Sequence, residues 1–155
     1  MFDRFNYRAR RVVSASLHEA HDRRAKAIEP EHLALALLRD DALAARFFPP
    51  PNAEAARAAI AARYGEPGTM ASSGDLPLSR AVFRIFKRTP TCAQEMNHAY
   101  AGPEHVLLVL LEEKTPVAAL LRDTGISAGI VRTAIAGEGE AFRSLGELLP
   151  PPYNP

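Results

Sequence analysis

Residues 29–38 read Glu-Pro-Glu-His-Leu-Ala-Leu-Ala-Leu-Leu, and residues 102–111 read Gly-Pro-Glu-His-Val-Leu-Leu-Val-Leu-Leu. The two stretches are one motif written twice, with Glu31 matching Glu104 at a separation of 104 − 31 = 73 residues. In each copy a proline stands where the first helical turn needs no backbone N–H, and a glutamate follows beside the positive end of the helix dipole. Because the run that follows is apolar on every side, each copy predicts a short buried helix at the centre of its own half of the chain.

The composition is that of an ordinary soluble globular protein, with 47% hydrophobic and 24% charged residues among 155. A formal net charge of +1 gives no electrostatic argument for nucleic acid or an anionic membrane as a partner. No run approaches the roughly 18 apolar residues that would span a bilayer. Cys92 is the only cysteine, so no intramolecular disulfide can form, and we expect a reducing, cytoplasmic location.

Helical periodicity and capping residues divide the chain into two similar halves. In the first half we expect a helix capped by Asn6, the buried helix from Pro30 to about Arg39, a short segment over 42–48, three prolines as a stop, and a helix over 53–64 capped by Asn52 and ended by Gly65. In the second half we expect a helix capped by Ser79, the buried helix from Gly102 and Pro103, a short helix from Thr115, and a last helix from Ser127 to about Ala136.

The predicted fold is all-α, with two four-helix repeats related by a pseudo-twofold axis, because each apolar helix needs neighbours on every side. The expected boundaries are a single domain over 1–149, formed by repeat one (1–65), a linker (66–76), repeat two (77–139) and a C-terminal extension (140–149). The extension would form one further short helix, and residues 150–155 a flexible proline-rich tail.

Pro90 conflicts with this pattern. It falls about eleven residues into the first helix of the second half, where an interior proline costs about 3 kcal/mol and removes a backbone hydrogen bond. We therefore expect a kink or break near Thr89.

The doubled motif resembles the Clp N-terminal (Clp R) domain, the double repeat that precedes the ATPase modules of ClpC-, ClpA- and ClpB-type unfoldases. Residues 1–13, Met-Phe-Asp-Arg-Phe-Asn-Tyr-Arg-Ala-Arg-Arg-Val-Val, are similar to the start of ClpC proteins. Both Glu-His runs lie 27 residues after the start of their repeats, from Phe5 to His32 and from Leu78 to His105. The resemblance covers roughly residues 1–136.

The resemblance implies a domain that recruits substrates and adaptor proteins to an unfoldase. In ClpC-type members it also implies phosphoarginine binding, in which an acid grips the guanidinium and helix-start groups hold the phosphate. Carried across, the acids are Glu31 and Glu104, and the helix-start positions are Asn6 and Ser79.

The chain departs from the family pattern at four of these positions. Asn6 and Ser79 replace helix-start threonines, and Pro30 and Pro103 replace the threonine before each Glu-His. Both prolines delete a hydroxyl and an N–H, which weakens the expectation of phosphoarginine binding.

A Gly-x-x-x-x-Gly-Lys-[Ser/Thr] phosphate loop is absent from the sequence, so this chain has no ATPase of that kind. It resembles a free-standing Clp N-domain, or one excised from a longer protein, and the proline tail favours a natural end. We therefore expect a monomeric, non-enzymatic interaction domain of Clp chaperone and proteolysis control, without cofactor or metal. Its partners would be a Clp ATPase, an adaptor or a degradation substrate, and an alternative role is a reader of phosphoarginine or a similar guanidinium group.

Simpler interpretations of the same residues remain open. An acid at the second helical position complements the dipole without binding anything. The two histidines suggest a metal site, but adjacent helical side chains point about 100° apart, so a structural role at the helix start is the better interpretation. Cys92 is read as a small apolar side chain, although with His98 it could be imagined as a nucleophile. The arginines near the N-terminus are interleaved with acids, which favours a solvated face over nucleic-acid binding.

Overall fold

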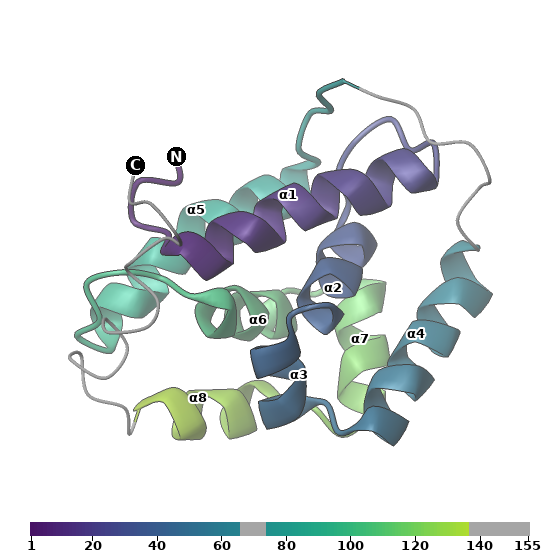
Figure 1. Cartoon of the computed structure of the whole chain (residues 1–155). Coiled ribbons are helices and arrows are strands. Elements are labelled where there is room, and N and C mark those ends of the chain that lie inside the picture. The colour runs from purple at the N-terminus through teal and green to yellow at the C-terminus, as the bar shows by residue number, and fades with distance from the viewer. Residues whose placement is uncertain (66–73, 137–155) are drawn as a thin grey trace.

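A computed structural model describes residues 1–65 and 74–136, and this part of the chain forms eight helices without a named strand, as Figure 1 shows. The helices are α1 (Tyr7–Asp22), α2 (Pro30–Leu38), α3 (Asp41–Phe47), α4 (Pro50–Tyr64), α5 (Arg80–Glu95), α6 (Pro103–Glu112), α7 (Pro116–Asp123) and α8 (Ala128–Ala136). The predicted all-α class is confirmed. Most of the expected linker, the C-terminal extension with its short helix, and the tail over 150–155 lie outside the described residues.

The two apolar helices occupy the centre, as the sequence predicts. Eight of the nine residues of α2 are buried, and so is every residue of α6 from Pro103 to Leu111. Helix α1 packs on α2, α5 packs on α6, and α2 and α6 contact each other, so the two repeats share one core. The sequences of α2 and α6 favour this central position, because only a helix without a polar face can be surrounded by other helices.

Two short parallel bridges tie the repeats together and reveal their symmetry. Phe5 bridges to Ala101, and Ile28 bridges to Leu78. The repeat offset of 73 converts each bridge into the other, since 5 + 73 = 78 and 28 + 73 = 101. The start of α1 is therefore fastened to the segment that enters α6, and the start of α5 to the segment that enters α2.

The predicted caps are present where the sequence places a short polar residue before a helix. The side chains of Asn6 and Ser79 accept from the backbone N–H groups of residues 9 and 82, at 2.9 and 3.2 Å. Thr115 and Ser127 cap α7 and α8 in the same way. Each cap satisfies one of the N–H groups that the first helical turn leaves without a partner.

The expected role of Asn52 is wrong. Helix α4 begins at Pro50 with Pro49 at its N-cap, three residues earlier than predicted. Proline is well suited to the first helical turn, so the run of prolines starts the helix instead of separating it from α3. The side chain of Asn52 donates instead to the carbonyl oxygen of Thr124 at 2.7 Å, which ties α4 to the end of α7.

The expected break near Thr89 is also wrong, because α5 continues through Pro90 to Glu95; the alternative, a kink, stays a prediction. Residues on both sides of Pro90 face the core, including Phe86 and Cys92, each 0% exposed. Thr89 is buried too, and its hydroxyl donates to the carbonyl oxygen of Ile85 at 2.6 Å. Burial of this face outweighs the local cost of the proline.

No helix within residues 1–65 and 74–136 is long and apolar enough to cross a membrane.

Candidate functional site at the helix starts

The four predicted site residues are brought together as two pairs, each formed by both repeats. The backbone N–H of Asn6 donates to the carbonyl oxygen of Ala101 at 2.9 Å, three residues before Glu104. The backbone N–H of Ser79 donates to the carbonyl oxygen of Ile28 at 3.0 Å, three residues before Glu31. We call the first the α1–α6 site and the second the α2–α5 site.

In the α1–α6 site the acid is already bound to a guanidinium of the same chain. Glu104 is 3% exposed, and its Oε2 accepts from Nη1 of Arg8 at 3.2 Å. Nη2 of Arg8 donates to Oδ1 of Asp40 at 2.7 Å, and this oxygen also accepts from the N–H of Leu43 as the cap of α3. Arg8 therefore connects the starts of α1, α6 and α3.

The α2–α5 site lacks such an arginine. The counterpart of Arg8 is residue 8 + 73 = 81, which is Ala81. Glu31 is half-buried, and within the described chain no ion pair holds its carboxylate. Burial raises the pKa of Glu31; its own backbone N–H opposes the rise, nearby Glu29 adds to it, and two arginines also oppose it. This carboxylate is thus accessible, and no charged partner in the described chain contacts it.

The histidine of each motif caps its own helix. Nδ1 of His32 accepts from the N–H of Glu29, and Nδ1 of His105 accepts from that of Gly102, both at 2.9 Å. A side chain at the third helical position that reaches back to the N-cap is half of a capping box. Burial, with a smaller contribution from the charge of an arginine, lowers the pKa of His32 to about 4, so the ring stays neutral and able to accept. The structural interpretation of both histidines is confirmed.

His105 makes a second bond that His32 lacks. Its Nε2 lies 2.9 Å from Nδ1 of His98, and both rings are buried. Because Nδ1 of His105 accepts from Gly102, a neutral ring carries its proton on Nε2 and donates it to His98. Within residues 1–65 and 74–136, no group of three or more histidine, cysteine or acidic side chains could hold a metal ion.

Cys92 is 0% exposed in the interior of α5, and burial raises the pKa of its thiol. A thiolate is the reactive form of cysteine, so this environment suits the predicted role of a small apolar side chain and not that of a nucleophile.

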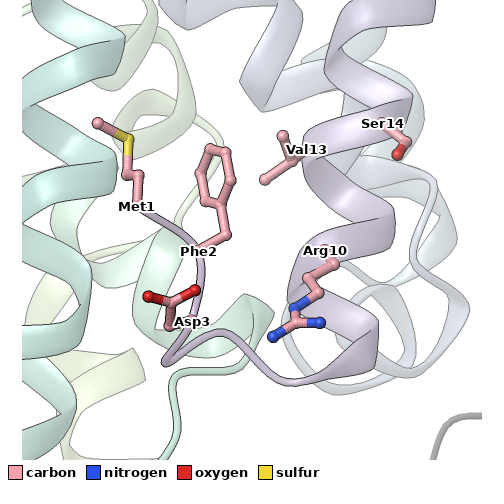
Figure 2. Close-up of a pocket in the computed structure, with 6 residues that line it drawn as sticks. All are labelled: Met1, Phe2, Asp3, Arg10, Val13 and Ser14. Carbon is pink, nitrogen blue, oxygen red and sulfur yellow. The ribbon is translucent and has the colours of Figure 1, made fainter. Parts of the chain in front are cut away.

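A cavity of about 450 Å³ lies beside the N-terminal segment, and sequence reasoning did not find it. Figure 2 shows Phe2 projecting toward Val13 of α1, with Asp3 and Arg10 at the other end of the cavity. The ring of Phe2 also packs edge-on against Phe86 of α5, with centroids 5.4 Å apart. The sequence signal for this cavity was the apolar pair Met1 and Phe2. These residues precede α1, so the helical periodicity of α1 does not include them.

Comparison with known proteins decides the family. The model of the Clp repeat (R) N-terminal domain matches residues 4–124 and again 78–143. The chain belongs to this family. The second match begins at the start of repeat two, as expected of a doubled unit.

Relatives of this Clp N-domain include the N-terminal regions of long chaperones and a shorter protein. It is 33% identical over 135 residues to the chloroplastic chaperone ClpD1 of rice, which covers 81% of this chain and 14% of that protein. It is also 33% identical over 112 residues to an uncharacterized protein of Mycobacterium tuberculosis, covering 72% of this chain and 44% of that protein. The chain thus spans less than half the length of these relatives.

Solved Clp-type N-domains share the fold. The N-terminal domain of ClpD from Arabidopsis thaliana has a TM-score of 0.64 at 22% identity, covering 88% of this chain and 94% of that one. The Hsp104 N-terminal domain from Candida albicans has a TM-score of 0.65 at 17% identity, covering 88% and 92%. These identities show the all-α fold alone, so the role of each side chain must come from the chain itself.

Proposed function

We propose that this Clp N-domain is a non-enzymatic protein-interaction domain of the Clp chaperone and proteolysis system. It binds degradation substrates, adaptor proteins or a Clp unfoldase, and it acts as an accessory or a decoy. The proposal includes a cytoplasmic location, which suits the lone buried thiol, and a monomeric state.

The observation that supports this proposal is the exposure of apolar side chains on the N-terminal segment and on α5. The cavity of Figure 2 lies between the N-terminal segment and α1, where Met1, Phe2 and Val13 form its apolar part, and Met1 is 53% exposed. Phe83, one helical turn before Phe86 on α5, is 43% exposed. Phe83 lines a separate hollow with Leu78, Arg80 and Arg84. Exposed apolar side chains beside such hollows are typical of a surface that a protein partner covers.

The test is affinity capture from a cell extract with the wild-type chain and two variants. Phe83→Ser should reduce recovery of Clp subunits, adaptors or proteolysis substrates several-fold, because it removes an apolar contact on this surface. Ile130→Ser is the matched control, since Ile130 is 53% exposed on α8. Capture of no Clp-system protein by the wild-type chain, or an equal loss with both variants, would contradict the proposal.

A second candidate function is the reading of phosphoarginine at the α2–α5 site. Two features support it: the carboxylate of Glu31 is accessible to a guanidinium, and the N-terminus of α5 with Ser79 is suited to a phosphate. The α1–α6 site is less suited, because Arg8 already binds Glu104 there.

Titration calorimetry with phosphoarginine tests this candidate. We expect one ligand per chain, loss of binding in Glu31→Gln, and retained binding in Glu104→Gln. An absence of heat with the wild-type chain removes the candidate, and so does retained binding in Glu31→Gln.

A further inference from the structure

A second cavity, of about 350 Å³, lies between the end of α1, helix α2 and helix α4. Its lining is partly apolar, but most of its lining residues are charged: Arg23, Arg39 and Arg57 face it together with Glu19 and Glu54. It shares no lining residue with the cavity of Figure 2 and contains none of the four helix-start residues. Three arginines against two acids leave a charge of 3 − 2 = +1.

One buried acid orients two of the guanidinium groups. Glu19 is 4% exposed, and its two carboxylate oxygens accept from Nη1 of Arg23 at 2.6 Å and from Nε of Arg39 at 2.8 Å. Since Arg39 binds through Nε, its two terminal amino groups remain for another acceptor. Both guanidinium groups are thus held in place before any ligand arrives.

The bond to Glu19 leaves one donor of Arg23 unsatisfied. The side chain of Arg23 is 11% exposed, and its Nε is buried without a hydrogen-bond partner in the part of the chain that the structure describes. A buried donor on a charged group is costly to leave unpaired, so such a group requires an explanation. This donor is enclosed, so its resonance reports changes at the guanidinium of Arg23 and is not itself a contact for a ligand in the cavity.

The third guanidinium is fixed from the opposite wall. Nη2 of Arg57 on α4 donates to the carbonyl oxygen of Leu38 at 3.2 Å, at the end of α2. Cations at the ends of helices are expected, because Arg23 and Arg39 cap α1 and α2 and complement the dipoles. The dipoles do not explain why all three arginines line one cavity.

The second repeat shows that the fold does not require this arrangement. At an offset of 73, Glu19 corresponds to Cys92, Arg23 to Met96 and Arg39 to Glu112. The counterpart of Arg57 is residue 57 + 75 = 132, and Arg132 is neutralised by Glu112 at 2.7 Å. Repeat one therefore gathers cations where repeat two has apolar side chains and an ion pair.

We propose that the cavity between α1, α2 and α4 binds a phosphate group, with Arg23, Arg39 and Arg57 as its ligands. Three guanidinium groups on different walls suit a tetrahedral oxyanion with several acceptor oxygens better than a planar carboxylate. The volume leaves room for part of the molecule that carries the phosphate. That carrier is either a small metabolite or a phosphorylated side chain of a protein.

The test is an NMR titration of the whole chain with inorganic phosphate, in which the Nε–H resonance of Arg23 is followed. We expect this resonance to shift, and the affinity to fall at least tenfold in the double variant Arg39→Gln, Arg57→Gln. Both residues are exposed enough to be replaced without loss of the fold, and Arg57→Gln alone should weaken binding about threefold.

The matched control is Arg84→Gln, Arg132→Gln, which removes the same charge from exposed ion pairs of repeat two. It should change the affinity less than twofold. No shift in Arg23, or an equal loss in both double variants, overturns the proposal, and so does acetate binding as tightly as phosphate. Parallel titrations with glycerol 3-phosphate and N-acetyl-phosphoserine amide identify the carrier, since the tighter binder indicates a metabolite or a modified protein.

Discussion

The α1–α6 and α2–α5 sites have the same backbone and differ in what their acids contact. In one, Glu104 is buried against Arg8; in the other, Glu31 is half-buried, and the counterpart of Arg8 is Ala81. The bridges that form both sites are interchanged by the repeat offset, so the backbone does not account for the difference. Arginine in one repeat and alanine at the equivalent position of the other account for the ion pair of Glu104 that Glu31 lacks among the described residues.

His32 and His105, each directly after the glutamate of its motif, differ between the repeats in a similar way. Both cap their helices through Nδ1, but among the described residues only His105 has a buried histidine partner, because the counterpart of His98 is residue 98 − 73 = 25, which is Ala25. The polar side chains at the start of α6 in repeat two thus bond to one another within the protein, whereas those at the start of α2 in repeat one are more accessible.

The largest expected effect comes from breaking the ion pair between Arg8 and Glu104 in the α1–α6 site. Arg8→Met leaves Glu104 buried without this cation and should lower the free energy of unfolding by about 3 to 4 kcal/mol, near the lower end for a buried ion pair because Arg8 is 20% exposed. The measurement is urea denaturation at pH 7. Arg84→Met removes an exposed ion pair with Glu113 and should cost less than about 1 kcal/mol.

A double-mutant cycle separates this pair from the packing of the arginine stem. Arg8→Met with Glu104→Gln should cost clearly less than the two single variants added together, because the buried carboxylate that had lost Arg8 is gone as well. Additive losses would show that the ion pair is not what stabilises the α1–α6 site.

The next effect is the pH dependence that His32 imposes. Its pKa falls from 6.5 in the unfolded chain to about 4 in the fold, so the folded state binds fewer protons between these values. The contribution of His32 is complete above pH 6.5 and is lost as the pH falls toward 4; a pKa lowered from 6.5 to about 4 corresponds to a total loss of about 3 kcal/mol.

The check is urea denaturation between pH 7 and pH 4 for the wild type and for His32→Asn, which keeps an acceptor near the position of Nδ1 but does not titrate. The variant should lose less stability across this range. His18→Asn is the control, since His18 is exposed, and it should leave the curve unchanged. Parallel curves for His32→Asn and the wild type would contradict the assignment.

The sequence was a good guide wherever a signal is local and repeated. The doubled apolar run predicted two buried helices, and Asn6, Ser79, Thr115 and Ser127 were found as caps because capping acts over three residues. Pro90 misled the prediction since the cost of a proline is local, whereas the burial that outweighs it comes from the whole of α5.

The difference between the two sites could not be predicted from the sequence, for a physical reason. Arg8 reaches Asp40 and Glu104 across 32 and 96 residues, and no periodicity records such contacts. The arginine-lined cavity was missed in the same way, because its side chains come from the ends of three helices that only tertiary packing brings together.

The smallest expected effect comes from removing the two N-caps, Asn6 of the α1–α6 site and Ser79 of the α2–α5 site. Asn6 is 4% exposed and Ser79 is half-buried, although each bonds one N–H of its helix. Asn6→Ala should therefore cost about 1 to 2 kcal/mol and Ser79→Ala about 0.5 to 1, because water can replace the serine hydroxyl more easily. Urea denaturation of both variants measures the difference. A larger loss for Ser79→Ala would mean that the α2–α5 site is the more rigid of the two. The contrast between a buried α1–α6 site and an accessible α2–α5 site would then have to be reversed.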